Sequence, residues 1–243
     1  MSISVCIATY NGSIYIEEQI RSILNQLSQE DNIIISDDNS IDNTINIIKQ
    51  IDDTRINIYY NEGEKGYTSN FENALKHANG DIIFLADQDD VWIEGKVSAT
   101  LAQLKKYQFV VTDANVVDSE LNILYESHFN LTSVRTGFIR NFLKTRYIGA
   151  CMAFRRYVLD KALPFPKNHS LCAHDYWLAI VSELYFNVGL IKTPYLKYRR
   201  HTNNASNGGL NKSNVSILNR LYKRFYCGYY LIKILFSKGK FNE

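Results

Sequence analysis

The chain has 243 residues, 46% of them hydrophobic, and this length is typical of one globular domain. Its formal net charge of +2 is unevenly distributed, because residues 212–243 hold seven of the 27 Lys and Arg residues and one of the 25 Asp and Glu residues. Residues 1–211 are therefore slightly acidic. This excludes a general nucleic-acid-binding domain, which carries its basic groups on the folded body, and we expect no nucleic-acid partner.

The cysteines and the amino-terminal sequence indicate the cellular compartment. The four cysteines form no Cys-x-x-Cys pair, and Cys6 lies in an apolar run, as expected for a core residue in a reducing compartment. The first residues lack the basic start and the apolar length of a signal peptide. No segment reaches the roughly 18–20 apolar residues that span a bilayer. We therefore expect a cytoplasmic protein, either soluble or peripheral at the inner face of the cell membrane.

The first half of the chain alternates apolar strands with amphipathic helices. Strands are predicted at residues 3–8, 33–36, 56–60 and 81–86. One helix follows the first strand, with apolar side chains at helical spacing: Ile16, Ile20, Ile23, Leu24 and Leu27. Another precedes the fourth strand and ends at Gly80, with Phe71, Ala74, Leu75 and Ala78 on one face. This alternation predicts an α/β fold, in which a mostly parallel, twisted sheet is flanked by helices.

The second half is less regular. Strands are predicted at residues 109–112 and 148–154, and a helix at residues 176–185. Neither an internal repeat nor a low-complexity linker is present. We therefore divide the chain into one domain, residues 1–211, and a basic, amphipathic helical tail, residues 212–243.

Polar clusters follow three of the predicted strands. Thr9 comes after the first strand, Asp37 and Asp38 close the second, and residues 87–90 (DQDD) follow the fourth. In parallel sheets of this kind the ligand site lies beyond the carboxyl ends of the strands. We therefore expect these clusters to form one site at that edge.

The acidic cluster at residues 87–90 has two interpretations. Three carboxylates in four residues repel one another unless a cation or water screens them, and Mg²⁺ or Mn²⁺ prefers such oxygen ligands and bridges them to substrate phosphates. The alternative is a solvated acidic loop that caps a helix holding Trp92 and Ile93. The sequence contains neither Gly-x-Gly-x-x-Gly nor a P-loop, so phosphates are expected to be held through a metal.

Three segments together resemble the family 2 glycosyltransferases of the GT-A fold: residues 5–12 (VCIATYNG), 35–40 (ISDDNS) and 85–92 (LADQDDVW). They occur in the family's order and spacing and cover about the first hundred residues densely. Weaker similarity extends to about residue 205. The resemblance implies a GT-A domain and transfer of a sugar from a nucleotide-sugar donor.

The resemblance also implies roles for individual residues. Thr9 and Asp38 line the pocket for the donor base, with Asp37 beside it; the alternatives are a strand end for Thr9 and a helix cap for either aspartate. Asp87 contacts the donor ribose, and Asp89 binds the metal that holds the diphosphate.

Later segments match the family less closely. Residues 174–177 (HDYW) stand where the family carries two acidic residues, which leaves Asp175 as the catalytic carboxylate. His174, in the first position, is expected to be packed and hydrogen-bonded. The segment 198–204 resembles one in which a histidine completes the metal shell, so His201 is predicted as a ligand, with a structural histidine as the alternative. Gly149 is expected beside the acceptor pocket, and Lys65 either faces the diphosphate or is solvated.

The tail mixes apolar side chains with Arg220, Lys223, Arg224 and Lys233. Its excess of basic groups predicts contact with an anionic membrane surface, since each basic residue near such a bilayer is worth about 1 kcal/mol. The alternative is a helix that packs on the domain.

The sequence therefore predicts an inverting, metal-dependent glycosyltransferase. The sequence of residues 86–92 resembles that of rhamnosyl- and hexosyltransferases of bacterial O-antigen or capsule synthesis. That implies a dTDP-rhamnose or UDP-hexose donor and a lipid-linked or surface oligosaccharide acceptor. A nucleotidyltransferase and a non-catalytic nucleotide-sugar or carbohydrate binder of the same fold stay open as alternatives.

Overall fold

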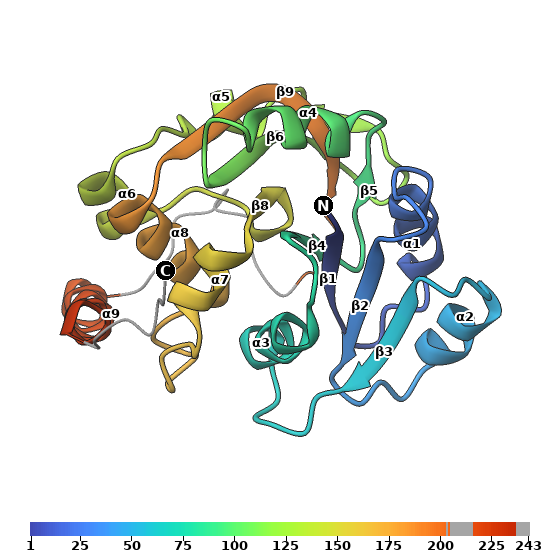
Figure 1. The fold of residues 1–243 in the computed structure, drawn as a ribbon, viewed down its shortest axis with the longest axis horizontal. Coiled ribbons are helices and arrows are strands. Elements are labelled where there is room, and N and C mark those ends of the chain that lie inside the picture. The colour runs from blue at the N-terminus through green and yellow to red at the C-terminus, as the bar shows by residue number, and fades with distance from the viewer. Residues whose placement is uncertain (203, 205–215, 237–243) are drawn as a thin grey trace.

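The computed structural model describes residues 1–202, 204 and 216–236 (Figure 1). The strands are β1 (Ile3–Thr9), β2 (Asn32–Asp37), β3 (Ile56–Tyr60), β4 (Ile82–Asp87), β5 (Val91–Trp92), β6 (Phe109–Val117), β7 (Ile123–Tyr125), β8 (Met152–Arg155) and β9 (Val188–Arg199). The helices are α1 (Ile16–Leu24), α2 (Thr44–Gln50), α3 (Tyr67–His77), α4 (Lys96–Gln103), α5 (His128–Thr132), α6 (Phe138–Lys144), α7 (Arg156–Ala162), α8 (His174–Tyr185) and α9 (Ile217–Phe236).

The strands of the described residues form one mixed sheet in the order β3-β2-β1-β4-β8-β6-β9-β5, with β7 paired to β6. The first four strands of this order are parallel. In the other half β8 is antiparallel to both its neighbours, β9 is parallel to β6, and β5 is antiparallel to β9. The predicted α/β architecture is confirmed, and the parallel character is concentrated in the amino-terminal half.

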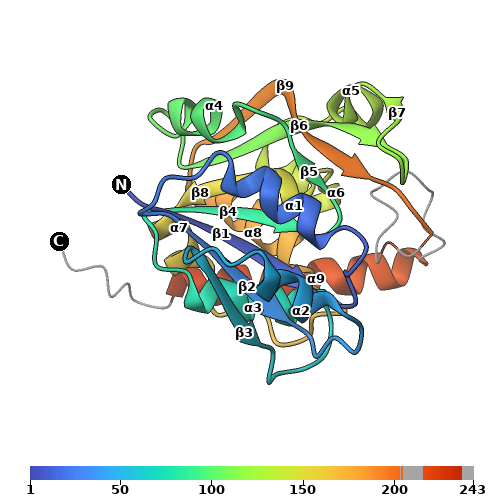
Figure 2. The same ribbon diagram turned by 90° about the vertical axis from the view of Figure 1, so that its right-hand side faces the viewer.

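Helices cover both faces of the parallel half. In Figure 1, α1 and α2 lie on one side of β1–β3, and α3, α7 and α8 lie on the other. Figure 2 shows α1 on the near face of the sheet and α8 and α9 on the far face. The strand register places Thr9 opposite Asp37 and Ala8 opposite Asp87, so the predicted polar clusters end at one edge.

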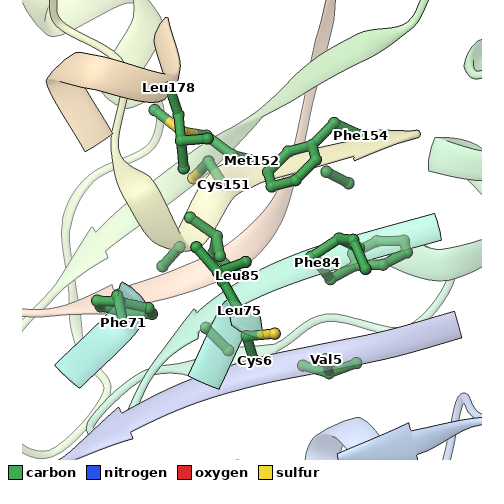
Figure 3. Packing of buried hydrophobic residues seen from close by; sticks show 14 of the residues in the cluster. Val5, Cys6, Phe71, Leu75, Phe84, Leu85, Cys151, Met152, Phe154 and Leu178 are labelled. Atoms are coloured by element: carbon green, nitrogen blue, oxygen red, sulfur yellow. The ribbon is translucent and has the colours of Figure 1, made fainter. Parts of the chain in front are cut away.

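The core joins the two halves of the sheet. Figure 3 shows Cys6 of β1, Leu75 of α3, Leu85 of β4, Met152 of β8 and Leu178 of α8 packed together. Each large apolar side chain buried in this way contributes about 1.5–3 kcal/mol relative to an exposed one. Cys6 is fully buried, as predicted, and all four cysteines are free thiols. The result is a rigid support for the strand ends.

One predicted strand is wrong, and so is the helix assumed in the alternative interpretation of residues 87–90. Residues 148–154 do not form one strand, because a 3₁₀ turn, η1 (Gly149–Cys151), precedes β8. A continuous apolar run is buried whether it forms a strand or a turn, so its sequence has no periodicity that distinguishes the two. Trp92 lies in β5 rather than in a helix, because residues 91 and 92 pair with β9 at Lys197 and Leu196. That pairing depends on a strand a hundred residues away, which a local pattern does not reveal.

The carboxy-terminal helix α9 is present where a helical tail was predicted. The proposed boundary between residues 211 and 212 lies outside the described residues. One face of α9 packs on the domain through buried Cys227 and Leu231, while Phe225 and Ile232 are exposed. Among the described helices, none combines the length and apolarity needed to cross a bilayer.

Candidate active site

A cavity of about 930 Å³ opens at the carboxyl ends of β1 and β4. Its wall includes five of the predicted site residues: Thr9, Asp38, Asp87, Asp89 and Asp175. These residues come from four segments far apart in the sequence. The sheet register brings the ends of β1, β2 and β4 together, and the first turn of α8 adds Asp175. Asp37 and His201 do not line the cavity.

Thr9 is held by a side chain that the sequence analysis did not single out. Its hydroxyl donates to Gln88 Oε1 at 2.6 Å, and the same oxygen accepts from the backbone N–H of Tyr10 at 2.9 Å. Asn70 of α3 donates to the Thr9 carbonyl at 3.0 Å. Gln88 and Asn70 therefore shape this part of the cavity, although neither residue type is distinctive enough in a sequence to indicate that role.

Asp37 and Asp38 point in different directions. Asp37 is fully buried and accepts from the backbone N–H of Ser40 at 2.8 Å, so its carboxylate stabilises the turn after β2. Asp38 accepts from Asn61 Nδ2 and from the backbone N–H of Gly66, both at 2.8 Å. The φ angle of Gly66 is +126°, a conformation that side-chain-bearing residues rarely adopt. Asp38 thus holds the loop before α3 against the cavity.

The acidic cluster is crowded. Oxygens of Asp87, Asp89 and Asp90 lie within 4.8 Å of one another. Burial, and then the charges of Asp89 and Asp175, raise the pKa of Asp87 to about 7. Burial also raises the pKa of Asp90 well above its usual value, and one of its oxygens has no hydrogen-bond partner among the described residues.

A buried lysine lies beneath this cluster. Lys96 is 1% exposed, donates to the Ala150 carbonyl at 2.9 Å and lies 4.9 Å from the centre of the Trp92 ring. Burial lowers its pKa, while Asp90 and Asp87 raise it. The charges of Lys96 and Arg200 lower the pKa of Asp87 only in part, since it remains raised to about 7, so the cluster favours a further cation.

Asp89 is joined to the segment after β9. Its Oδ2 lies 2.9 Å from His201 Nε2 and accepts from Asn204 Nδ2 at 2.8 Å. The His201 ring stacks on Tyr15 at a centroid distance of 5.1 Å. The predicted pair of Asp89 and His201 is therefore in contact, and Asn204 is a third member that the sequence analysis did not select.

These side chains fit a divalent metal. Mn²⁺ binds both carboxylate oxygens and an imidazole nitrogen, whereas Mg²⁺ binds mainly the carboxylate oxygens. The raised pKa of Asp87 means that its ionised form is disfavoured by burial and by the neighbouring carboxylates, and a bound cation would offset this.

Arg199 fixes this part of the site. Its guanidinium donates to the carbonyl of Asp89 at 2.7 Å and to Ser119, and it forms an ion pair with Glu18 of α1. Its backbone N–H donates to Asp90 at 2.9 Å, and the guanidinium lies 4.4 Å from the centre of the Tyr15 ring. A buried arginine with all these partners holds the acidic loop, α1 and β9 in one arrangement.

Asp175 occupies the first turn of α8 and accepts from the backbone N–H of Tyr176 at 2.6 Å. The amino-terminal end of a helix favours a carboxylate. Its neighbour His174 is stacked on Phe71 at 4.1 Å, and burial lowers its pKa to about 4. His174 is packed, as predicted, but the expected hydrogen bonds are absent: neither ring nitrogen has a partner among the described residues.

The rest of the wall comes from elements without a recognisable motif. It includes Tyr125 of β7, Leu131 of α5, Lys144 at the end of α6, and Arg146 and Tyr147 before η1. Tyr147 donates to Glu183 Oε1 at 2.5 Å, which ties this segment to α8. Gly149 lines the cavity beside Asp175: a Cβ there would lie 3.4 Å from the Asp175 Cβ. Lys65 also lines the cavity.

Comparison with solved structures identifies the fold. Staphylococcus aureus TarS residues 1–349 in complex with UDP-GlcNAc superposes with a TM-score of 0.69 at 16% identity, covering 100% of this chain and 74% of that one. The Pyrobaculum calidifontis mannosyltransferase PcManGT, in complex with GDP-Man and Mn²⁺, gives a TM-score of 0.63 at 15% identity, covering 98% and 76%. At these identities the likeness shows the fold alone.

Sequence comparison identifies the family. Residues 4–163 match glycosyl transferase family 2. The dTDP-rhamnosyl transferase RfbG of Shigella flexneri is 30% identical over 213 residues, covering 81% of this chain and 72% of that protein. The Escherichia coli UDP-Glc:alpha-D-GlcNAc-diphosphoundecaprenol beta-1,3-glucosyltransferase WfgD is 27% identical over 210 residues, covering 81% and 76%. The chain belongs to the family 2 glycosyltransferases and has the GT-A fold.

Proposed function

We propose that the protein transfers a sugar, with inversion at the anomeric carbon, from a nucleoside-diphosphate sugar to a saccharide acceptor. One observation carries the proposal: Asp175 lines the same cavity as Asp87 and Asp89, and its charge raises the pKa of Asp87. A general base and a metal-binding group are thus close enough to act on one substrate.

Different residues of the cavity bind the donor, accept the proton and hold the metal in this proposal. Thr9, Asp38 and Asp87 line the cavity and bind the donor nucleoside in this proposal, and Asp37 supports the turn after β2. Asp175 accepts the proton of the acceptor hydroxyl as that oxygen attacks the anomeric carbon. Asp89 and His201 would hold Mn²⁺ or Mg²⁺, which would supply positive charge for the leaving diphosphate when bound. Arg200 also lines the cavity, and its positive charge acts on Asp87.

The names of the relatives support the substrate classes. RfbG is a dTDP-rhamnosyl transferase, and WfgD uses UDP-Glc with a diphosphoundecaprenol-linked acceptor. We infer a dTDP-rhamnose or UDP-hexose donor and a lipid-linked acceptor in bacterial polysaccharide synthesis. A nucleotidyltransferase would require a glycine-rich basic loop after β1, and residues 9–15 (TYNGSIY) contain neither Lys nor Arg.

We also propose that α9 contacts an anionic membrane surface at the inner face of the cell membrane. The helix contains no acidic residue, and four of its residues are basic: Arg220, Lys223, Arg224 and Lys233. Its outward face exposes Leu218, Leu221, Phe225, Tyr229 and Ile232. This combination of an apolar stripe and basic groups is typical of helices that lie in a membrane interface.

A direct assay tests the activity. Purified protein is incubated with dTDP-rhamnose or UDP-hexoses, Mn²⁺, and a short-chain lipid-diphosphate acceptor, and the anomeric configuration of the product is determined by NMR. Transfer with inversion supports the proposal. Binding of the nucleotide sugar without transfer or hydrolysis would favour the non-catalytic binder. In a parallel incubation with a nucleoside triphosphate and a sugar 1-phosphate, release of pyrophosphate with formation of a nucleotide sugar would favour the nucleotidyltransferase.

A further inference from the structure

We propose that Lys144 and Arg146 bind the diphosphate of the lipid-linked acceptor, on the side of the cavity away from the donor. The inference rests on the proposed function and deepens it by naming the subsite that distinguishes a diphosphate-linked saccharide from a free one. It concerns residues 144–148, from the last residue of α6 to the residue before η1, and the sequence analysis singled out neither Lys144 nor Arg146.

The position of this segment follows from its neighbours. Lys144 and Arg146 both line the cavity, and the chain then reaches Gly149, which lies against Asp175 and His174. A saccharide whose hydroxyl reaches Asp175 therefore lies close to residues 144–148. The donor side is formed by different elements, since Asp38 and Asp89 follow β2 and β4.

The segment is held in place from both sides. Tyr147 donates to Glu183 of α8, and Tyr176 donates through its hydroxyl to the Phe142 carbonyl at 2.7 Å. Arg224 of α9 donates to the Leu143 carbonyl at 2.8 and 3.1 Å. The backbone that carries the two cations is thus anchored to α8, which carries Asp175, and to α9.

The two cations are available to a ligand. Lys144 and Arg146 are exposed, and within residues 1–202, 204 and 216–236 neither makes an ion pair. A guanidinium and an ammonium together suit a diphosphate, which accepts charge-assisted hydrogen bonds from both. A sugar hydroxyl alone needs no such charge, so the pair indicates an anionic part of the acceptor.

An apolar surface adjoins the pair. Ile139 and Leu143 of α6 are exposed, and α9 crosses the end of α6 with Leu221 and Phe225 exposed. A lipid chain that leaves a diphosphate at Lys144 has apolar side chains along its path. The order of sugar at Asp175, diphosphate at the cations and lipid at α6 and α9 matches the order of groups in a lipid-linked saccharide.

Binding of farnesyl diphosphate, measured by calorimetry, tests the subsite. The protein is first saturated with Mn²⁺ and with UDP or dTDP, tested in turn, so that the donor side is filled. We expect the wild type to bind farnesyl diphosphate and to bind farnesol much more weakly. The double variant Lys144→Ala/Arg146→Ala should weaken farnesyl diphosphate binding by roughly ten- to a hundredfold, because hydrogen bonds to charged groups are lost, and should leave nucleotide binding unchanged.

The matched control is Lys105→Ala/Lys106→Ala, an exposed basic pair after α4 that does not line the cavity, and it should bind both ligands normally. Equal farnesyl diphosphate binding by the wild type and the Lys144/Arg146 double variant would overturn the inference. So would a double variant that loses binding to phosphatidylglycerol vesicles but retains farnesyl diphosphate, since the cations would then contact lipid headgroups. A wild type that binds nucleotide but not farnesyl diphosphate contradicts this inference alone, whereas absence of nucleotide binding contradicts the proposed function.

Discussion

At the scale of single residues, Asp175 and its surroundings carry the proposed chemistry. The carboxylate stands at the amino-terminal turn of α8 and lines the cavity, so it has access to an acceptor hydroxyl. Asp175→Asn keeps the size and hydrogen-bonding capacity of the side chain but accepts no proton at neutral pH. We expect turnover to fall by roughly a hundred- to ten-thousandfold, with nearly unchanged nucleotide-sugar affinity, measured by steady-state kinetics and calorimetry.

His174→Asn belongs in the same experiment, because this histidine is the other titratable group beside Gly149. Its pKa of about 4 keeps the imidazole neutral at pH 7, and its nitrogens are buried. A smaller loss of turnover in His174→Asn than in Asp175→Asn is therefore expected. Near-normal turnover in Asp175→Asn would assign the base to another residue.

His174 also predicts a pH dependence of stability. Its folded-state pKa of about 4 lies below the ordinary value of 6.5, so the unfolded chain binds more protons between these values. The contribution is therefore favourable above pH 6.5 and is lost as the pH falls towards 4. From pH 7 to pH 5 the loss amounts to about 2 kcal/mol. Urea unfolding should show that His174→Leu loses less stability than the wild type over this interval; parallel losses would contradict the buried, neutral histidine.

Asp89 predicts the metal requirement. Asp89→Ala removes the carboxylate in contact with His201 and Asn204, and its position after β4, outside the apolar core, should leave the fold intact. Transfer should be abolished, and the increase in thermal stability that Mn²⁺ confers on the nucleotide-bound wild type should disappear. Chelator should inactivate the wild type reversibly. Full activity in excess chelator is the result that rules out this role.

At the scale of elements, α9 combines a packed face and an exposed face. Phe225 and Ile232 are exposed while Cys227 and Leu231 are buried, so both faces can be altered separately. The double variant Phe225→Glu/Ile232→Glu should keep the unfolding temperature of the wild type. Its binding to anionic vesicles should fall at least tenfold in a sedimentation assay, because two apolar contacts are replaced by negative charges.

The control for α9 is Ile41→Glu, an exposed apolar residue between β2 and α2. The helix α2 lies at the opposite side of the molecule from α9 (Figure 1). It should bind vesicles like the wild type, and binding of the wild type should weaken with salt. Unchanged vesicle binding in the α9 variant would leave packing on the domain as the function of this helix.

At the scale of the whole molecule, Arg199 connects parts of the chain that the sequence keeps apart. It contacts Asp89, Ser119 and Glu18 from a position that is 3% exposed. Arg199→Met leaves buried acceptors unpaired, and urea unfolding should show a loss of about 3 kcal/mol. Glu18→Gln alters only the half-exposed partner and should cost less than about 1 kcal/mol. Similar small losses in both variants would show that Arg199 does not join these segments.

Much of the amino-terminal half could be predicted from local patterns. Apolar strands alternate with helices of clear periodicity, and the strand ends carry polar clusters, so the positions of Thr9, Asp38 and Asp87 at one edge follow from general rules of parallel sheets. The strand β9 and the pairing of β5 with it were not predicted. Both depend on contacts between distant segments, and residues 188–199 show neither a helical nor a simple alternating pattern.

The sequence by itself determined the fold class, the family and the residue types of the site, because these depend on short-range periodicity and on motifs whose residues are adjacent. Tertiary structure alone decided which neighbours share the cavity. Asp37 and Asp38 are the same residue type one position apart, yet Asp37 caps a turn and Asp38 faces the cavity. Asp89 and His201 meet across 112 residues, and Lys144 reaches the cavity through α6, because long-range packing, which no local pattern records, sets these positions.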